Sequence, residues 1–295
     1  SKKSGGVTIS HLRFGKDPIR STYLINKANF VACHCPAYIH KYNMVQDLVP
    51  GGTFLLNCSW DMAGLEEHLP GQVKRYIAEN DIKFYTIDGI KIGKEIGLGG
   101  RINTVLQSAF FALSNIIPAD KANELMKAAA KATYGRKGDK IVQMNYDAID
   151  AGAKQVVEIA VPESWKDAAD EGLTTPHVGE GGRADVVDFV KNIQAKVNAQ
   201  EGNTLPVSAF NEYVDGSTPS GSSAYEKRGI AVDIPIWQPD NCIQCNRCAY
   251  VCPHAVIRPI ALTEEEAANA PEGMDMIDMM GMPNMKFSIA VSAYD

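Results

Sequence analysis

The first half of the chain alternates short apolar runs with segments of helical periodicity. Apolar runs typical of buried strands lie at 30–33, 53–58 and 82–87. Helices are expected between them, at 37–48 and 70–80. Strand and helix that alternate with short connections predict a mostly parallel sheet covered by helices on both faces. We therefore expect an α/β fold from Val7 to about Val157.

The pattern changes along the second half. Apolar residues at helical spacing predict further helices at 102–113, 119–133 and 142–156, which should pack on the sheet. From about residue 162 the periodicity fades, and the stretch 214–223 has the Gly, Ser, Thr and Pro content of a linker. The last part should contain an acidic helix at 262–270, a Met-rich turn at 274–285 and a strand at 286–291. We expect three parts: 1–161, a connecting segment 162–232, and 233–295.

Composition and charge narrow the possible partners. The chain has 295 residues, of which 45% are hydrophobic, enough for one large and one smaller domain. Its formal net charge of -6 and the lack of a long Lys/Arg run argue against nucleic acid or an anionic membrane as partner. No apolar stretch approaches the roughly 18–20 residues that span a bilayer. The start has no signal-peptide hydrophobic region and no initiator Met, so we predict a cytoplasmic chain cut from a longer one.

Four of the seven cysteines lie close together in the last part. Cys242, Cys245, Cys248 and Cys252, followed by Pro253, have the C-x2-C-x2-C-x3-C-P spacing of bacterial ferredoxins. The first three thiolates should hold one [4Fe-4S] cluster, and the fourth should ligate a second cluster. The last part is therefore predicted to be a partial bacterial-ferredoxin-like α+β domain, whose missing half should begin past residue 295.

Other interpretations of the polar residues are weaker. Structural zinc needs a second C-x2-C knuckle or a His pair, and neither follows Cys252. His254 fits an exposed or supporting position, since the thiolates already explain the spacing. The remaining cysteines sit at strand-like positions and are expected to be small buried hydrophobes: Cys33, Cys35 and Cys58.

Several segments together resemble single-chain pyruvate:ferredoxin oxidoreductases. The matching segments are 4–15, 32–38, 99–105, 225–228 and the cysteine run, in this order. The chain is similar to the gamma-like third domain, the small fourth domain and the first part of the inserted ferredoxin domain of these enzymes. The thiamine-binding domains and the second cysteine run are absent from it. This piece alone is therefore not expected to turn over pyruvate.

The resemblance implies cofactors and partners for the complete enzyme. Thiamine diphosphate with Mg²⁺ would decarboxylate pyruvate, coenzyme A would take the acyl group, and electrons would leave through [4Fe-4S] clusters to ferredoxin or flavodoxin. The partners of this piece would be the remaining domains of the same enzyme, in a homodimer. A stand-alone iron–sulfur carrier or adaptor subunit is the alternative, and a zinc-stabilised interaction domain is a third possibility.

Two clusters of residues are candidates for coenzyme A or phosphate. Lys2 and Lys3 match a region that lies near coenzyme A in the family, although a solvated chain terminus is equally compatible with them. Gly100 and Arg101 open the helix that carries Asn103, and a glycine turn at a helix N-terminus presents N–H groups to an anion. An ordinary helix cap is the alternative there. No catalytic residue is assigned. In particular, a Ser-His nucleophile is not expected among the strand-like residues at 10–13, which would alternate between faces.

Overall fold

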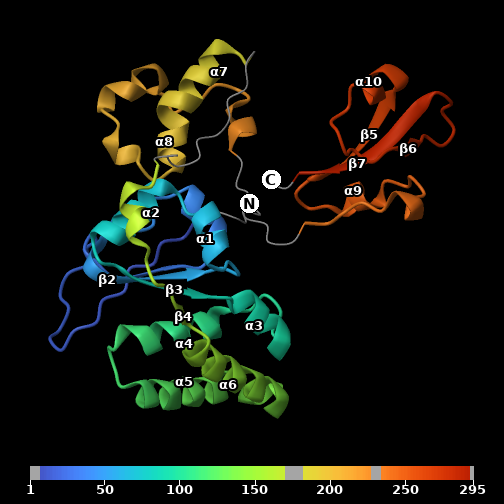
Figure 1. Cartoon of the computed structure of the whole chain (residues 1–295). Coiled ribbons are helices and arrows are strands. Elements are labelled where there is room, and N and C mark those ends of the chain that lie inside the picture. The colour runs from blue at the N-terminus through green and yellow to red at the C-terminus, as the bar shows by residue number, and fades with distance from the viewer. Residues whose placement is uncertain (1–6, 170–181, 227–233, 293–295) are drawn as a thin grey trace. The chain divides into compact units, whose positions relative to one another are not determined.

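The computed structural model describes residues 7–169, 182–226 and 234–292. The chain divides into two compact units, Val7–Ser220 and Gly221–Asp295, which are treated separately below (Figure 1). The three-part division expected from the sequence stays a prediction.

The first unit is built on a four-stranded sheet in the order β1-β2-β3-β4. Its strands are β1 (Ala28–Cys33), β2 (Leu48–Asn57), β3 (Lys83–Ile87) and β4 (Val157–Glu158). The pairs β1–β2 and β2–β3 are parallel, with Phe54 opposite Val31 on one side and Phe84 on the other, whereas the short β4 is antiparallel to β3. The predicted mostly parallel sheet is confirmed.

Helices cover both faces of this sheet (Figure 1). Phe54 and Leu56 of β2 pack on one face, beneath α1, α2 and the buried Trp165, while Leu55 packs on the other face against α3, α4 and α6. This alternation along β2 follows from the two-residue period of a strand. The helices are α1 (Met62–His68), α2 (Gly71–Glu79), α3 (Gly89–Ile96), α4 (Asn103–Ser114), α5 (Ala119–Tyr134) and α6 (Asp139–Lys154).

The helix expected at 37–48 is wrong. The structure has only the short 3₁₀ helix η1 (Pro36–His40), followed by turns, and β2 already begins at Leu48. Ile39 and Val45 are both fully buried. Ile39 lies in η1 and Val45 in the turns that follow it, so both side chains reach the core without a continuous helix.

The strand-like alternation near the start is also misleading. Residues 7–27 form neither helix nor strand. Instead, the Arg13 side chain donates hydrogen bonds to backbone carbonyls of this segment, and the His11 side chain accepts one from a backbone N–H. Alternation predicts a strand only where a neighbouring backbone offers the ladder of hydrogen bonds.

The segment after β4 contains more helix than the sequence suggested. The helical elements there are η3 (Glu163–Asp167), α7 (Ala184–Phe189), the π-helical η4 (Val190–Gln194), α8 (Ala195–Asn198), η5 (Gly202–Thr204) and η6 (Val207–Tyr213). A further short helix, η2 (Gly135–Lys137), links α5 and α6. The run from α7 to α8 buries Val186, Phe189, Val190 and Ile193, an apolar stripe that sequence reasoning overlooked.

The second unit contains a small antiparallel sheet in the order β5-β7-β6. Its elements are η7 (Ser222–Tyr225), η8 (Pro239–Asn241), α9 (Arg247–Val251), β5 (Ile257–Thr263), α10 (Glu264–Ala268), β6 (Ile277–Asp278) and β7 (Met285–Val291). The predicted strand at 286–291 is confirmed as the central β7. The acidic helix is shorter than expected because β5 extends to Thr263, which caps α10 in a reciprocal hydrogen-bond pair with Glu266.

Candidate iron–sulfur site and anion-binding turn

The four clustered cysteines lie on a loop that leads into a short helix. Cys242 follows η8, Cys248 lies in α9, and Cys252 is the residue that ends α9. Between them, Gln244 and Asn246 adopt left-handed backbone conformations, with φ of 54° and 56°. Non-glycine residues rarely adopt this conformation, and such positions concentrate at binding sites. The loop between the cysteines therefore contains two left-handed residues, a conformation that regular helices and strands do not use.

The thiol groups have the chemistry that cluster ligation requires. All four are free of disulfides, Cys245 and Cys248 are exposed, and Cys242 and Cys252 are partly buried. The backbone N–H of Gln244 donates to Cys242 Sγ over 3.4 Å. Backbone N–H groups, first that of His254 and then that of Val256, hold the pKa of Cys252 below its usual value. Such N–H···S contacts accompany thiolate ligands of iron–sulfur clusters.

The case for a cluster rests on the spacing of the four cysteines and on their thiol groups, and not on side chains that already converge on one point. Among the residues that the structure describes, no three or more His, Cys, Asp or Glu side chains are placed to hold a metal ion. A cubane needs four ligands, and the ferredoxin pattern draws them from two separate cysteine runs. The assignment of these cysteines as ligands therefore stays a prediction, which their free thiols and the N–H donors around them support.

A glutamine that sequence reasoning did not single out fixes this loop. Gln244 Nε2 donates to the carbonyl of Asp278 over 2.7 Å, and the N–H of Met280 donates to Gln244 Oε1 over 2.8 Å. The amide side chain of Gln244 thus makes a pair of hydrogen bonds with the backbone at the end of β6, as a neighbouring strand would. Because its partners lie 34 and 36 residues further along the chain, no local pattern could have indicated the contact.

In the first unit, the predicted anion-binding turn opens α4. Gly100, Arg101 and Asn103 are all exposed, and Ile102 at the cap position makes no side-chain hydrogen bond to the helix. The helix start expected from the sequence is confirmed. Lys2 and Lys3 lie outside the described residues, so their place relative to this turn stays a prediction.

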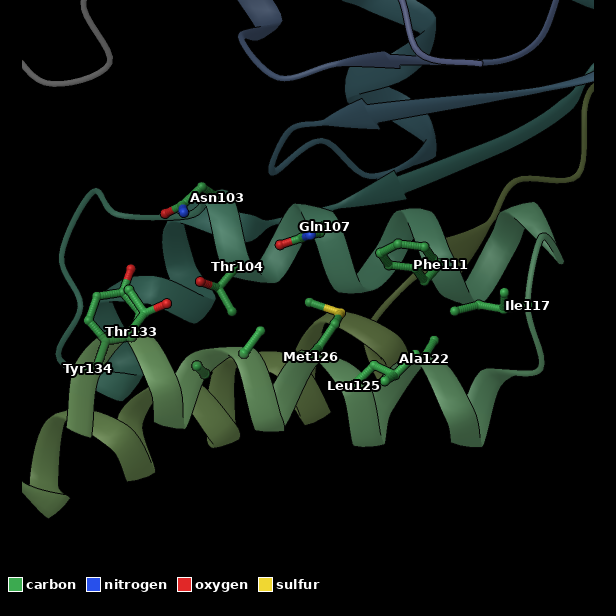
Figure 2. A pocket seen from close by; sticks show the side chains of 12 residues that line it. Asn103, Thr104, Gln107, Phe111, Ile117, Ala122, Leu125, Met126, Thr133 and Tyr134 are labelled. Atoms are coloured by element: carbon green, nitrogen blue, oxygen red, sulfur yellow. The ribbon is translucent and has the colours of Figure 1, made fainter. Parts of the chain in front are cut away.

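A pocket of about 310 Å³ lies between α4 and α5, beside this turn (Figure 2). Asn103, Gln107 and Thr133 mark its polar end, and Phe111 and Leu125 its apolar end. Sequence reasoning missed the pocket because it depends on how two helices pack, although Asn103 and Gln107 stand one helical turn apart and share a face.

The other three cysteines lie at or just beyond the ends of β1 and β2. Burial raises the pKa of Cys33 to about 12 and that of Cys58 to about 11, so both stay protonated thiols at neutral pH. Cys33 Sγ donates to the carbonyl of Cys35 over 3.1 Å. Cys33 and Cys58 are thus buried as expected, whereas Cys35 is only partly buried.

The chain thus combines an α/β unit with a cysteine loop of ferredoxin type. The family described as pyruvate ferredoxin/flavodoxin oxidoreductase matches residues 1–155. A domain of unknown function matches 180–231, and a 4Fe-4S binding domain matches 234–257. The chain belongs to the pyruvate ferredoxin/flavodoxin oxidoreductase family.

Curated relatives match over nearly the whole of this chain. It is 50% identical to a pyruvate-flavodoxin oxidoreductase of Enterobacter agglomerans over 100% of its own length and 24% of the relative's. It is 48% identical to a pyruvate:ferredoxin oxidoreductase of Moorella thermoacetica, covering 100% of this chain and 25% of that protein. A pyruvate dehydrogenase [NADP(+)] of Cryptosporidium parvum is 45% identical, over 93% of this chain and 15% of its own length. The chain thus spans about a quarter of the first two relatives.

None of the described helices is both long enough and apolar enough to cross a membrane.

Proposed function

We propose that this chain is part of a pyruvate:ferredoxin oxidoreductase, which converts pyruvate and coenzyme A to acetyl-coenzyme A and carbon dioxide and passes electrons through [4Fe-4S] clusters to ferredoxin or flavodoxin. One observation carries the proposal: the alignment with such an enzyme runs through the whole chain at 50% identity and includes the 4Fe-4S binding domain. Thiamine diphosphate with Mg²⁺ would supply the decarboxylation chemistry, bound by parts of the enzyme outside this chain.

The chain's own contribution is the electron relay. Cys242, Cys245 and Cys248 hold one cluster, and Cys252, at the end of α9, faces the neighbouring cluster. The spacing supports this division, because a thiol three residues beyond the third ligand and next to Pro253 is turned away from the first cluster.

A second contribution is to coenzyme A, through Lys2, Lys3, Gly100, Arg101 and Asn103. The exposed glycine turn and cation at the start of α4 support phosphate binding, since the N-terminus of a helix carries partial positive charge.

Steady-state kinetics of the full-length enzyme test the coenzyme A assignment. Replacing Lys2 and Lys3 together with Ala should raise the KM for coenzyme A with little effect on that for pyruvate. Lys121→Ala, which removes an exposed lysine paired with Glu124 on α5, is the control and should change neither constant. An unchanged KM for coenzyme A in the double variant would assign the two lysines to solvent.

The function itself is tested with the full-length polypeptide. Reduction of ferredoxin or a viologen dye should require both pyruvate and coenzyme A, and Cys248→Ser should abolish it while lowering the iron content. A stand-alone carrier or adaptor, the alternative, would have an intact mass close to 32.0 kDa and would show no reduction that depends on pyruvate.

We also propose that the complete enzyme is a homodimer in the cytoplasm. Seven free cysteines fit a reducing compartment, and the family resemblance suggests the dimer. Sedimentation of the full-length enzyme would measure its mass, and a monomer at micromolar concentration would contradict the dimer.

A further inference from the structure

The segment before β1 has a defined conformation without secondary structure. We call residues 8–25 the apolar arm. Arg13 Nη1 donates to the carbonyl of Ser21 over 2.9 Å, and Nη2 donates to that of Tyr23 over 2.7 Å. The Arg13 guanidinium also lies 3.9 Å from the centre of the Tyr23 ring, and the N–H of Ile25 donates to His11 Nδ1 over 3.0 Å. Side chains therefore tie the outgoing and returning limbs of the arm together.

In the arm, two polar side chains are partly buried, whereas most of the large apolar side chains are exposed. His11 and Arg13, which make the internal hydrogen bonds, are partly buried. Six large hydrophobic side chains are exposed, from 52% for Ile19 to 76% for Leu24: Ile9, Leu12, Phe14, Ile19, Tyr23 and Leu24. Single exposed hydrophobic residues are ordinary, but six within one short segment form the kind of surface that marks an interaction site.

The arm is attached firmly to the sheet layer. The Phe14 ring lies 6.0 Å from that of Phe110 on α4, and Phe110 in turn makes an edge-to-face contact with Phe30 of β1, at 5.0 Å. Phe14 is nevertheless still more than half exposed. The arm thus contacts α4 through Phe14, and its internal hydrogen bonds hold the rest of its apolar surface in a fixed shape, which lowers the entropic cost of binding a partner.

Charge indicates what kind of surface fits the arm. The arm contains three basic residues and one acidic residue, in a chain whose net charge is -6. A complementary surface therefore has an apolar centre with carboxylates at its rim.

The length of the relatives indicates where such a surface comes from. This chain spans only about a quarter of the first two relatives. Domains tethered to the same polypeptide meet the arm at an effective concentration of roughly millimolar, which a separate second copy does not reach. We propose that the apolar arm is the docking surface for another domain of the same polypeptide, one with an apolar patch flanked by carboxylates.

Photo-crosslinking in the full-length enzyme tests the proposal directly. A benzophenone amino acid at position 24, in place of Leu24, should give crosslinks to peptides from outside residues 1–295. When ¹⁴N- and ¹⁵N-labelled enzymes are prepared separately, mixed, dissociated and reassociated, these crosslinks should occur only within one isotope. Crosslinks that join the two isotopes would assign the arm to a second copy, and absence of crosslinks would leave it facing water; either result overturns the proposal. The same probe at exposed Asp120 on α5 is the control for random labelling.

Hydrogen exchange gives an independent measurement. Amides of residues 8–24 should exchange at least tenfold more slowly in the full-length enzyme than in the 295-residue chain. The double substitution Leu12→Ser and Leu24→Ser should abolish this difference without unfolding the unit, because both side chains are already more than half exposed. Equal exchange in the two polypeptides would refute the docking surface. Neither measurement uses catalytic activity, so the result does not depend on which substrate the enzyme oxidises.

Discussion

A single methyl group at the contact between α4 and α6 tests the packing that carries the candidate anion-binding turn. Gly152 lies on the buried face of α6. A Cβ at this position would collide with the carbonyl oxygen of Val105 and would lie 2.9 Å from Ser108 Cβ, both on α4. Because the first obstacle is backbone, no side-chain rotation relieves it, and the two helices must separate.

The sign and size of the effect follow from two opposing terms. In an exposed helix interior, replacing Gly with Ala gains about 1 kcal/mol. Overpacking a close contact typically costs about 1–3 kcal/mol, and collision with a backbone carbonyl lies at the upper end. Gly152→Ala should therefore lower the free energy of unfolding by about 2 kcal/mol. For a unit of this size each kcal/mol shifts Tm by about 2–4 °C, so Tm should fall by about 4–8 °C.

Gly135→Ala is the matched control. Gly135 at the end of α5 has helical φ and ψ of -54° and -35°, and a Cβ there would meet nothing within 4 Å. Its substitution should raise the free energy of unfolding by up to about 1 kcal/mol. Urea unfolding followed by tryptophan fluorescence in a Trp237→Phe background reports on this unit through Trp60 and Trp165. If Gly152→Ala were as stable as Gly135→Ala, the close approach of α4 and α6 would be refuted.

Three further predictions concern cysteines and the loop around them. In the intact enzyme, Cys245→Ser should remove mainly the cluster bound by the first three cysteines, whereas Cys252→Ser should remove its neighbour; electron paramagnetic resonance with iron analysis separates the two, and identical losses would contradict the division. Folding raises the pKa of Cys33 from 9.0 to about 12, so its contribution to stability is complete below pH 9 and lost as the pH rises toward 12, by up to about 1.4 kcal/mol per pH unit. Between pH 9 and 10.5 the free energy of unfolding should thus fall less steeply in Cys33→Ala than in the unsubstituted chain, and parallel curves would refute the shift. Gln244→Ala removes both hydrogen bonds to the turn after β6 and should change the cluster's reduction potential or spectrum in the intact enzyme; unchanged values would make Gln244 a surface residue.

The three parallel strands of the first unit, β1 to β3, could be predicted because each contains a local apolar run. The two-residue β4 was not predicted. The run expected at 53–58 is only the second part of β2, because the structure begins this strand at Leu48 and keeps Pro50, Gly51 and Gly52 inside it, with Gly51 at a φ of 74°. The spacing of the ligands could also be predicted, because the four cysteines lie in one short continuous segment of the sequence. The run from α7 to α8 was missed because Gly and acidic residues on either side masked its apolar stripe.

The wrong helix at 37–48 and the misjudged segment at 7–15 failed for a different reason. In both segments the spacing of apolar residues fits a regular helix or strand. In the structure, however, the backbone groups of these segments find other hydrogen-bond partners. Ile39 is buried from the short η1 and Val45 from a turn, and the Arg13 side chain supplies hydrogen-bond donors where a strand would need a neighbouring strand. Periodicity records which side chains could share a face, whereas the partners of the backbone groups decide whether that face forms.

The cysteine loop of the second unit also has exposed apolar residues on a backbone that hydrogen bonds hold in place. Ile243 lies between the first two cysteines, and Tyr250 and Val251 lie between the third and the fourth; Tyr250 is 91% exposed. A side chain so exposed buries almost no apolar surface, so it adds little hydrophobic stabilisation to the unit that carries it. Apolar residues interleaved with thiolate ligands do have a use where a cluster binds, because excluding water from the cluster is one of the terms that set its reduction potential. The arm before β1 and this loop therefore share one property: each presents apolar side chains in a backbone shape fixed by hydrogen bonds, from Arg13 in one case and Gln244 in the other, so that the surface exists before its partner is bound.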